Sequence, residues 1–311
     1  MSILSEPHFH SETAARARLE QIVWPKGPHC PRCGGFDRIT DVKGGRAGLR
    51  RCGPCKREFS VTVGTIFERS KVPLHKWFQA AHLMASSKKG ISAHQLHRTL
   101  KITYKTAWFM EHRLREAMRE LHPQPMGGNG KTVEMDETYI GGKDKNKHRN
   151  KRRGKGGMDK EIAFALVERG GRVRSHHVPS VSANTLGKVL HEQLDAATTL
   201  YSDDGGARVG AIYEKHASVN HSIGEYVRGD VHTNTIEGYF SILKRGITGV
   251  YHHVSPQHLK RYLAEFDFRY NERAALGVND EARGDKLIRG IVGKRLMYRD
   301  SSAASVAGPV N

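Results

Sequence analysis

The 311-residue sequence has few cysteines, few aromatic residues and no long apolar run. Because a membrane-spanning helix needs about 20 apolar residues, none is expected, and the polar N-terminus lacks the apolar core of an export signal. Acidic residues are scarce beside basic ones, 32 against 51, so the formal net charge is +19. This charge favours an acidic polymer or an acidic membrane surface as the partner. We therefore expect a soluble, intracellular protein of two or three domains that seeks a polyanion.

All four cysteines lie in one short stretch, as two Cys-x-x-Cys pairs: Cys30 with Cys33, and Cys52 with Cys55. Two such pairs at this separation can place four thiolates tetrahedrally around Zn²⁺. A disulfide pair or a redox Cys-x-x-Cys is the alternative, but the cytosol keeps thiols reduced and a redox site needs only one pair. The pattern predicts a zinc ribbon over residues 20–68 whose metal supplies much of its folding energy. The basic residues around it fit either DNA docking or a solvated face.

A helical pattern covers residues 70–122. Two helices split by a short turn predict a helix-turn-helix-like segment, in which the N-terminal residues of the second helix enter the major groove of DNA. In this chain those residues are Tyr104, Lys105 and Thr106. The alternative is a helical linker that packs the ribbon against the next domain. The Pro/Gly-rich stretch 123–130 predicts a domain boundary.

Strand and helix patterns alternate over residues 131–275, which predicts an α/β domain. The first expected strand carries Asp136 on the face opposite Met135. Asp203 and Asp204 end a later strand, at the edge where α/β sheets present their sites. Strands are expected at 131–140, 162–167, 173–178 and 198–204, with helices at about 184–195 and from Ser255 onward.

A further helix, expected in the stretch VHTNTIEGYFSILKRG, separates an apolar stripe from a polar stripe. The polar stripe holds Asn234, Glu237 and Lys244, so a carboxylate and an amine stand two turns apart on one side. With Asp136 and Asp203, Glu237 makes three carboxylates. Such a set suits two hard divalent cations in phosphoryl transfer on DNA, and Mg²⁺ accepts oxygen ligands of this kind. The alternative is that these acidic residues are simply solvated or ion-paired.

The stretch of residues 143–160 contains nine lysines and arginines. One interpretation is a disordered, solvated loop. Because the stretch directly follows the strand that carries Asp136, it can instead clamp DNA phosphates beside the site without reading bases. The expected contacts are Lys147, Arg149, Lys151, Arg152 and Arg153.

Several of these stretches together resemble one family: the bacterial insertion-sequence DDE transposases with an N-terminal zinc ribbon, of the ISXO-two-like group. The likeness covers roughly residues 20 to 275. The matching stretches are CPRCGG, CGPCKREFSVTVGTIFE, KTAWFMEHRLREAM, VEMDETYIGGK, YSDD and the long run from Asn220 to Arg273.

The resemblance implies that residues 131–275 form a DDE catalytic domain with a ribonuclease H-like fold, a mixed sheet with flanking helices. By position, the first acidic residue of the family falls on Asp136, the second on Asp203, and the third on Glu237. The basic residue that follows the third is Lys244.

Three further residues stay open as candidates for the site. Asp204 is the adjacent alternative to Asp203. Because some members of the group carry Asn at the third position, Asn234 is an alternative to Glu237. His232, two residues before Asn234, is a candidate supporting residue near the metals.

The sequence therefore predicts a transposase that binds the ends of its insertion sequence and catalyses metal-dependent DNA strand cleavage and strand transfer. It would use one structural Zn²⁺ and two catalytic Mg²⁺ or Mn²⁺ ions. The expected partners are the double-stranded DNA of the terminal inverted repeats and of the target, and no membrane. A homodimer or higher oligomer follows because synapsing two DNA ends needs two or more subunits.

The expected location is the cytoplasm of a bacterium, at the nucleoid. Residues 276–311 are left as a C-terminal tail without a functional signal. Two other functions are weighed against transposition: a zinc-ribbon DNA-binding regulator without catalysis, and a ribonuclease H-like nuclease.

Overall fold

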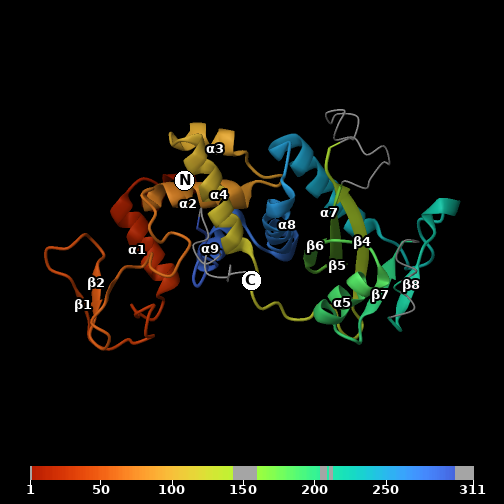
Figure 1. Cartoon of the computed structure of the whole chain (residues 1–311), viewed down its shortest axis with the longest axis horizontal. Coiled ribbons are helices and arrows are strands. Elements are labelled where there is room, and N and C mark those ends of the chain that lie inside the picture. The colour runs from red at the N-terminus through yellow and green to blue at the C-terminus, as the bar shows by residue number, and fades with distance from the viewer. Residues whose placement is uncertain (1, 143–159, 204–208, 210–212, 298–311) are drawn as a thin grey trace, which may run out of the picture. The chain divides into compact units, whose positions relative to one another are not determined.

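The computed structural model describes residues 2–142, 160–203, 209 and 213–297 of the chain (Figure 1). The chain divides into two compact units. Within the described residues, no helix is long and apolar enough to cross a membrane. Unit 1 comprises Met1–Ser86, Ala93–Met118 and Asp280–Asn311, and unit 2 comprises Ser87–Ser92 and Arg119–Asn279.

The N-terminal part of unit 1 is a helix followed by a small antiparallel ribbon. Arg50 of the ribbon pairs with Glu20 of the helix at 2.9 Å, and the rings of Trp24 and Phe59 lie 5.8 Å apart. This helix, absent from the sequence prediction, therefore packs with the ribbon. The elements are α1 (Glu12–Val23) and strands β1 (Ile39–Asp41), β2 (Arg50–Cys52) and β3 (Glu58–Phe59), paired in the order β1-β2-β3.

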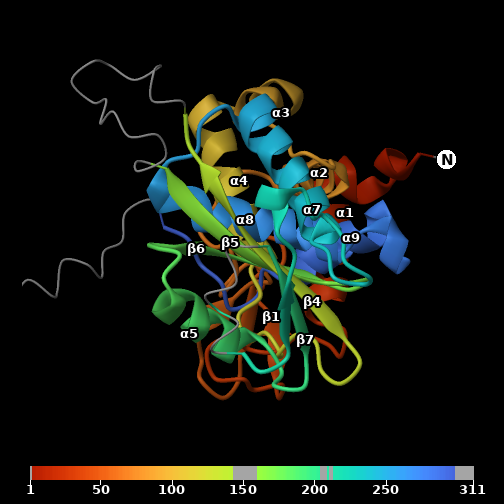
Figure 2. The same ribbon diagram turned by 90° about the vertical axis from the view of Figure 1, so that its right-hand side faces the viewer.

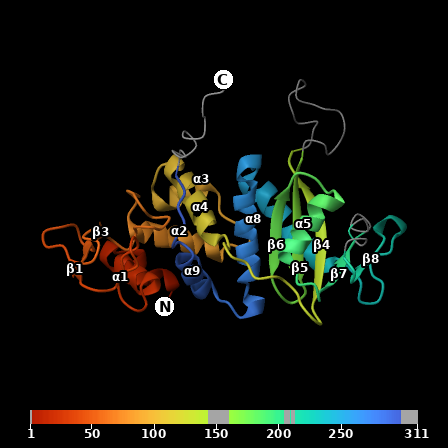
Figure 3. The same ribbon diagram turned by 60° about the horizontal axis from the view of Figure 1, so that its bottom comes forward.

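A helical bundle makes up the rest of unit 1 as far as the structure describes it. A turn joins α3 to α4, matching the predicted outline, and the hydroxyl of Thr103 accepts a hydrogen bond from the backbone N–H of Thr106 at 3.2 Å. Figure 3 shows α9 beside α2, so residues that the sequence leaves as a tail contribute Leu287 and Ile288 to a buried core. The helices are α2 (Leu74–Ser86), α3 (Ala93–Leu100), α4 (Tyr104–Met118) and α9 (Asp280–Arg289).

Unit 2 is built on a mixed sheet whose described strands run in the order β6-β5-β4-β7-β8. β4 pairs antiparallel with β5 and parallel with β7, β5 pairs antiparallel with β6, and β7 pairs parallel with β8. The short strand β8 is absent from the sequence prediction. The strands are β4 (Thr132–Ile140), β5 (Glu161–Glu168), β6 (Val173–Val178), β7 (Thr199–Ser202) and β8 (His216–Ser218).

Helices cover both faces of this sheet (Figure 2). Met135 of β4 lies in the apolar core on the face covered by α5 (Ala183–Gln193). Ile140 lies in the core on the other face, under α7 (Asn234–Gly246) and α8 (Pro256–Asn271). Because side chains alternate along a strand, Glu134 and Asp136 belong to the same face as Ile140. The mixed α/β domain with flanking helices that the sequence predicts is confirmed.

Candidate active site and metal centre

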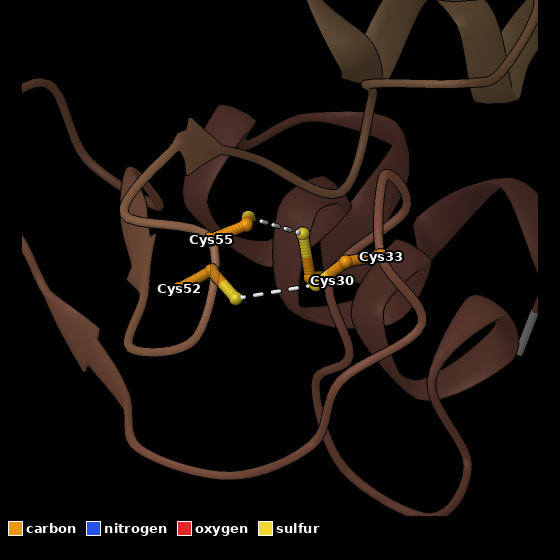
Figure 4. A group of neighbouring side chains, drawn as sticks. All are labelled: Cys30, Cys33, Cys52 and Cys55. Carbon is orange, nitrogen blue, oxygen red and sulfur yellow. Dashed lines mark hydrogen bonds between the residues drawn. The ribbon is translucent and has the colours of Figure 1, made fainter.

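The four cysteines of the ribbon converge on one point (Figure 4). All are free thiols, and their sulfur atoms lie within 4.8 Å of one another. The Sγ atoms of Cys30 and Cys55 are 3.6 Å apart, as are those of Cys33 and Cys52. A tetrahedral site with Zn–S bonds of about 2.3 Å needs sulfurs about 3.8 Å apart. The four side chains therefore fit a structural Zn²⁺, and the geometry supports the predicted metal over a disulfide.

The electrostatics of the cluster also favour a cation. Burial opposes ionisation of Cys30, but the backbone N–H groups of Arg32 and Cys33 donate to its sulfur, and the pKa falls to about 7. A hydrogen bond from the backbone N–H of Cys55 lowers the pKa of Cys52, but burial and the neighbouring thiols outweigh it and raise that pKa to about 12. Because negative thiolates this close repel one another, all four are ionised together only around a positive ion.

In unit 2, two neighbouring strands bring Asp136 and Asp203 to one edge of the site. β4 and β7 run parallel, with Glu134 opposite Tyr201. Continuing this register by two residues aligns Asp136 with Asp203, the residue that follows β7. Asp136 accepts a hydrogen bond from the backbone N–H of Glu137 at 2.7 Å.

Helix α7 supplies the third carboxylate. Glu237 lies in its first turn, with 49% of the side chain exposed. The hydroxyl of Thr233 donates to the Oε1 atom of Glu237 at 3.1 Å, and the Nε2 atom of His221 lies 4.0 Å from the same oxygen. The predicted apolar stripe of α7 is buried, which turns the opposite, polar side of the helix outward.

Asp136 lies close enough to Asp203 and to Glu237 for both charges to act on it. Burial, followed by the charge of Asp203, raises the pKa of Asp136 to about 8, and Glu137 and Glu237 push it in the same direction. Burial and Asp203 also raise the pKa of Glu137. An acidic group is held neutral in this way when negative charge accumulates without a compensating cation. A set of oxygen ligands with this property suits a hard divalent cation.

One residue of the site is missed by the sequence analysis. Glu134, on the same face of β4 as Asp136, is 0% exposed. Its carboxylate accepts hydrogen bonds from the backbone N–H groups of Thr235 and Ile236 at 2.9 and 3.0 Å, and from the Thr235 hydroxyl at 2.9 Å. Glu134 thus caps the N-terminus of α7 from the neighbouring strand. The one signal in the sequence was a second carboxylate two residues before Asp136, on the same face of the expected strand.

Arg169 completes this attachment. Its Nε atom donates to Glu134 at 2.7 Å, and its terminal nitrogens donate to the carbonyl oxygens of Asp230 and His232 at 2.8 and 3.0 Å. The guanidinium also lies over the ring of Tyr201, 5.0 Å from its centroid. Glu134 and Arg169 therefore bind the start of α7 to the strands that carry Asp136 and precede Asp203.

Two parts of the chain match known domains. Residues 127–271 match the ISXO2-like transposase domain, and residues 10–58 match the transposase zinc-ribbon domain. The chain is also 32% identical over 279 residues to a protein in the transposable element ISH50 of Halobacterium salinarum. This match covers 84% of this chain and 91% of that protein. The chain belongs to the ISXO2-like transposases.

The matched regions of this transposase coincide with its two candidate sites. The ISXO2-like domain runs from just before β4 to the end of α8 and so contains Asp136, Asp203 and Glu237. The zinc-ribbon match includes α1 and all four cysteines. The resemblance inferred from the sequence is confirmed.

The remaining candidates of the ISXO2-like domain lie at separate positions. Asn234 is the exposed first residue of α7, and its backbone N–H donates to the Nδ1 atom of His232 at 3.4 Å. That Nδ1 atom also lies 3.4 Å from Oε1 of Glu134, so His232 lies beside the contacts that hold the start of α7. Lys244 is exposed two turns after Glu237, and among the described residues no ion pair joins it to the carboxylates.

The predicted DNA contacts Tyr104, Lys105 and Thr106 lie in unit 1. Tyr104, Lys105 and Thr106 form the first turn of α4, where Tyr104 stacks on His94 with ring centroids 4.3 Å apart. The structure brings these three together on one turn. Asp204, Lys147, Arg149, Lys151, Arg152 and Arg153 lie outside the described residues.

Proposed function

We propose that this transposase binds the ends of its insertion sequence and catalyses metal-dependent cleavage of DNA, followed by strand transfer. The observation that carries the proposal is the approach of three carboxylates, from β4, the end of β7 and α7, within the ISXO2-like domain. The sheet supports a ribonuclease H-like fold for this domain, because β6, β5 and β4 form an antiparallel meander that β7 and β8 extend in parallel.

Asp136, Asp203 and Glu237 are the proposed ligands of two Mg²⁺ or Mn²⁺ ions. When bound, such ions activate the attacking oxygen and stabilise the leaving one. The role of the protein itself is to hold the three carboxylates on rigid strands and a helix. Asp204 and Asn234 are the alternative ligands to Asp203 and Glu237.

Basic residues supply the proposed contacts to DNA. Lys244, on the exposed side of α7, binds a phosphate of the strand being cut. The first turn of α4 reads the transposon end through Tyr104, Lys105 and Thr106. The basic stretch after β4 clamps the backbone with Lys147, Arg149, Lys151, Arg152 and Arg153. Two or more subunits together hold two DNA ends.

The test is cleavage of a DNA fragment carrying one transposon end, in Mg²⁺ and in Mn²⁺. Asp136→Asn and Asp203→Asn are expected to abolish cleavage and to leave the affinity for the end near normal, because each removes one charged ligand and little volume. Glu192→Gln is the matched control, since it neutralises an exposed carboxylate on α5, on the opposite face of the sheet.

Cleavage by Asp136→Asn or Asp203→Asn at the wild-type rate would refute the proposed ligand set. A wild-type protein that binds the ends and cuts none of them in either metal would refute the proposed activity. That result would favour the regulator without catalysis.

A further inference from the structure

Unit 1 contains a cavity of about 360 Å³ between α4 and the segment that leads into α2. Four cationic side chains line it: Arg69, Lys71, Lys105 and Arg113. No carboxylate is among its lining residues in the described chain. A hollow with this lining has a positive potential, which attracts an anion.

The wall opposite α4 is held firmly by side-chain hydrogen bonds. The hydroxyl of Ser70 accepts from the indole N–H of Trp77 and from the backbone N–H of Val72, both at 3.1 Å. Arg113 of α4 donates to the carbonyl oxygen of Glu68 at 3.4 Å. Arg69 lies in this wall with a positive φ of 59°. The wall is therefore ordered before any ligand arrives, which lowers the entropic cost of binding.

The accessible cations lie at the mouth of the cavity. Arg69, Lys71 and Lys105 are exposed. Neither Arg69 nor Lys71 forms an ion pair with a carboxylate in the part of the chain that the structure describes. Arg113 is partly buried, and its guanidinium lies 4.8 Å from the centroid of the Phe109 ring. The two exposed residues of the wall thus present positive charge that the fold itself does not use.

The cavity adjoins the turn proposed to enter the major groove. Thr103, Lys105 and Thr106, which cap and begin α4, are among its lining residues. When the first turn of a helix contacts base edges in the major groove, the sugar-phosphate backbone that borders the groove passes the flanking elements. The segment around Arg69 and Lys71 is such a flanking element.

We propose that this cavity binds phosphates of the backbone of duplex DNA, with Arg69 and Lys71 as the principal contacts. The inference rests on the proposed binding of transposon ends by α4 and adds the backbone contact that sets its register. Phosphate contacts of this kind position the protein and carry no sequence information. Arg69 and Lys71 thus contribute affinity alike for every duplex, whereas the exposed residues of α4 contribute specificity.

The experiment compares the wild type with the double variant Arg69→Gln/Lys71→Gln. The control is Lys26→Gln/Arg289→Gln, which removes the same charge from exposed positions of unit 1 outside the cavity. Fluorescence anisotropy measures the dissociation constant for a transposon-end duplex and for a scrambled duplex between 50 and 300 mM NaCl, a range of about sixfold. Zinc content and the melting temperature verify folding.

The test variant is expected to bind both duplexes about tenfold more weakly at about 100 mM salt. The salt slope, which is the slope of log affinity against log salt concentration, is expected to become shallower by about 2, since each phosphate contact contributes about 0.9. The control is expected to keep most of the slope. An unchanged slope in the folded test variant would overturn the inference, and so would a loss confined to the transposon end. The proposed function fails separately, if the wild type itself does not prefer the transposon end to the scrambled duplex.

Discussion

The carboxyl group of Asp136 lies in surroundings that disfavour its charged form. Burial and the charge of Asp203 raise its pKa to about 8, against an ordinary value near 4. Between these two pH values the folded protein keeps a proton that the unfolded chain has released. The free energy of unfolding of the metal-free protein therefore falls as the pH rises from about 4 to about 8.

The first prediction concerns this single group. In metal-free buffer, Asp136→Asn is expected to melt about 5 °C above the wild type at pH 8.5 and near it at pH 4.5, because an amide does not ionise. Adding Mg²⁺ at pH 8.5 is expected to stabilise the wild type more than the variant. Differential scanning calorimetry measures both differences. Removal of Mg²⁺ by dialysis, rather than by chelation, leaves the zinc in place.

Equal pH dependence of melting in the two proteins would contradict this account of Asp136. An equal response of both to Mg²⁺ would remove Asp136 from the proposed ligand set.

Single residues also show what the sequence can and cannot reveal. The four-cysteine cluster could be predicted because its spacing is local, and the face of β4 that carries Asp136 because side chains alternate along a strand. Glu134 could not be assigned a role, because its partners lie about 100 positions later, at Thr235 and Ile236. A buried charge has meaning only when its partners are known.

Helix α7 is the element on which the geometry of the third carboxylate depends. Its first backbone N–H groups point at Glu134, and Arg169 holds the chain that precedes it. Glu237, one turn further along, is therefore oriented by contacts that do not include the substrate.

The second prediction tests this positioning role. Glu134→Gln is expected to slow cleavage of transposon ends by about 10- to 100-fold and to raise the Mn²⁺ concentration needed for half-maximal rate, as loss of a supporting contact does in metal sites. Binding to the ends is expected to stay normal. The matched variant Thr235→Val, which removes one donor and keeps both backbone N–H groups, is expected to have a smaller effect. Cleavage rates across a Mn²⁺ titration measure the difference.

If Glu134→Gln lowers thermal stability and leaves the Mn²⁺ dependence unchanged, Glu134 has a structural role only. A change in metal dependence is the signature of a displaced ligand.

Whole elements were predictable where their patterns are long and regular. The apolar stripe of α7 and the alternation of β4 define both elements in the sequence. β8 spans only three residues, too few for a periodic pattern, and α9 is polar enough to resemble a solvated tail. α1 carries only two buried residues, so its apolar face is weak in the sequence. These elements are recognised by what they pack against: β8 pairs with β7, α1 contacts the ribbon, and α9 packs on the distant α2.

The whole molecule carries two kinds of candidate metal ligand in two units: a four-thiolate cluster in one and carboxylates in the other. The third prediction uses this separation. The wild type is expected to contain about one zinc per chain, and Cys30→Ser/Cys52→Ser is expected to release it and to abolish binding to transposon ends. Because unit 2 has its own core, stabilisation by Mg²⁺ is expected to persist in the variant. Metal analysis measures the zinc content and DNA-binding titrations measure the affinity for the ends. Full zinc retention in the double variant would contradict the assignment of the four cysteines as zinc ligands.

The net charge of +19 also belongs to the whole molecule. It favours association with any DNA at low salt, so affinity by itself says little about function. Preference for transposon ends and chemistry on them are the informative quantities.

The central claim, that three carboxylates catalyse cleavage at transposon ends, is tested most directly at the third position. Cleavage of a single-end DNA fragment in Mg²⁺ and in Mn²⁺ should be compared between Glu237→Gln and Asn234→Ala, with Glu192→Gln as control. We expect Glu237→Gln to be inactive with end binding intact, because Mg²⁺ prefers a charged oxygen ligand, and Asn234→Ala to be only impaired. Normal cleavage by Glu237→Gln together with an inactive Asn234→Ala would contradict the account and make Asn234 the third ligand.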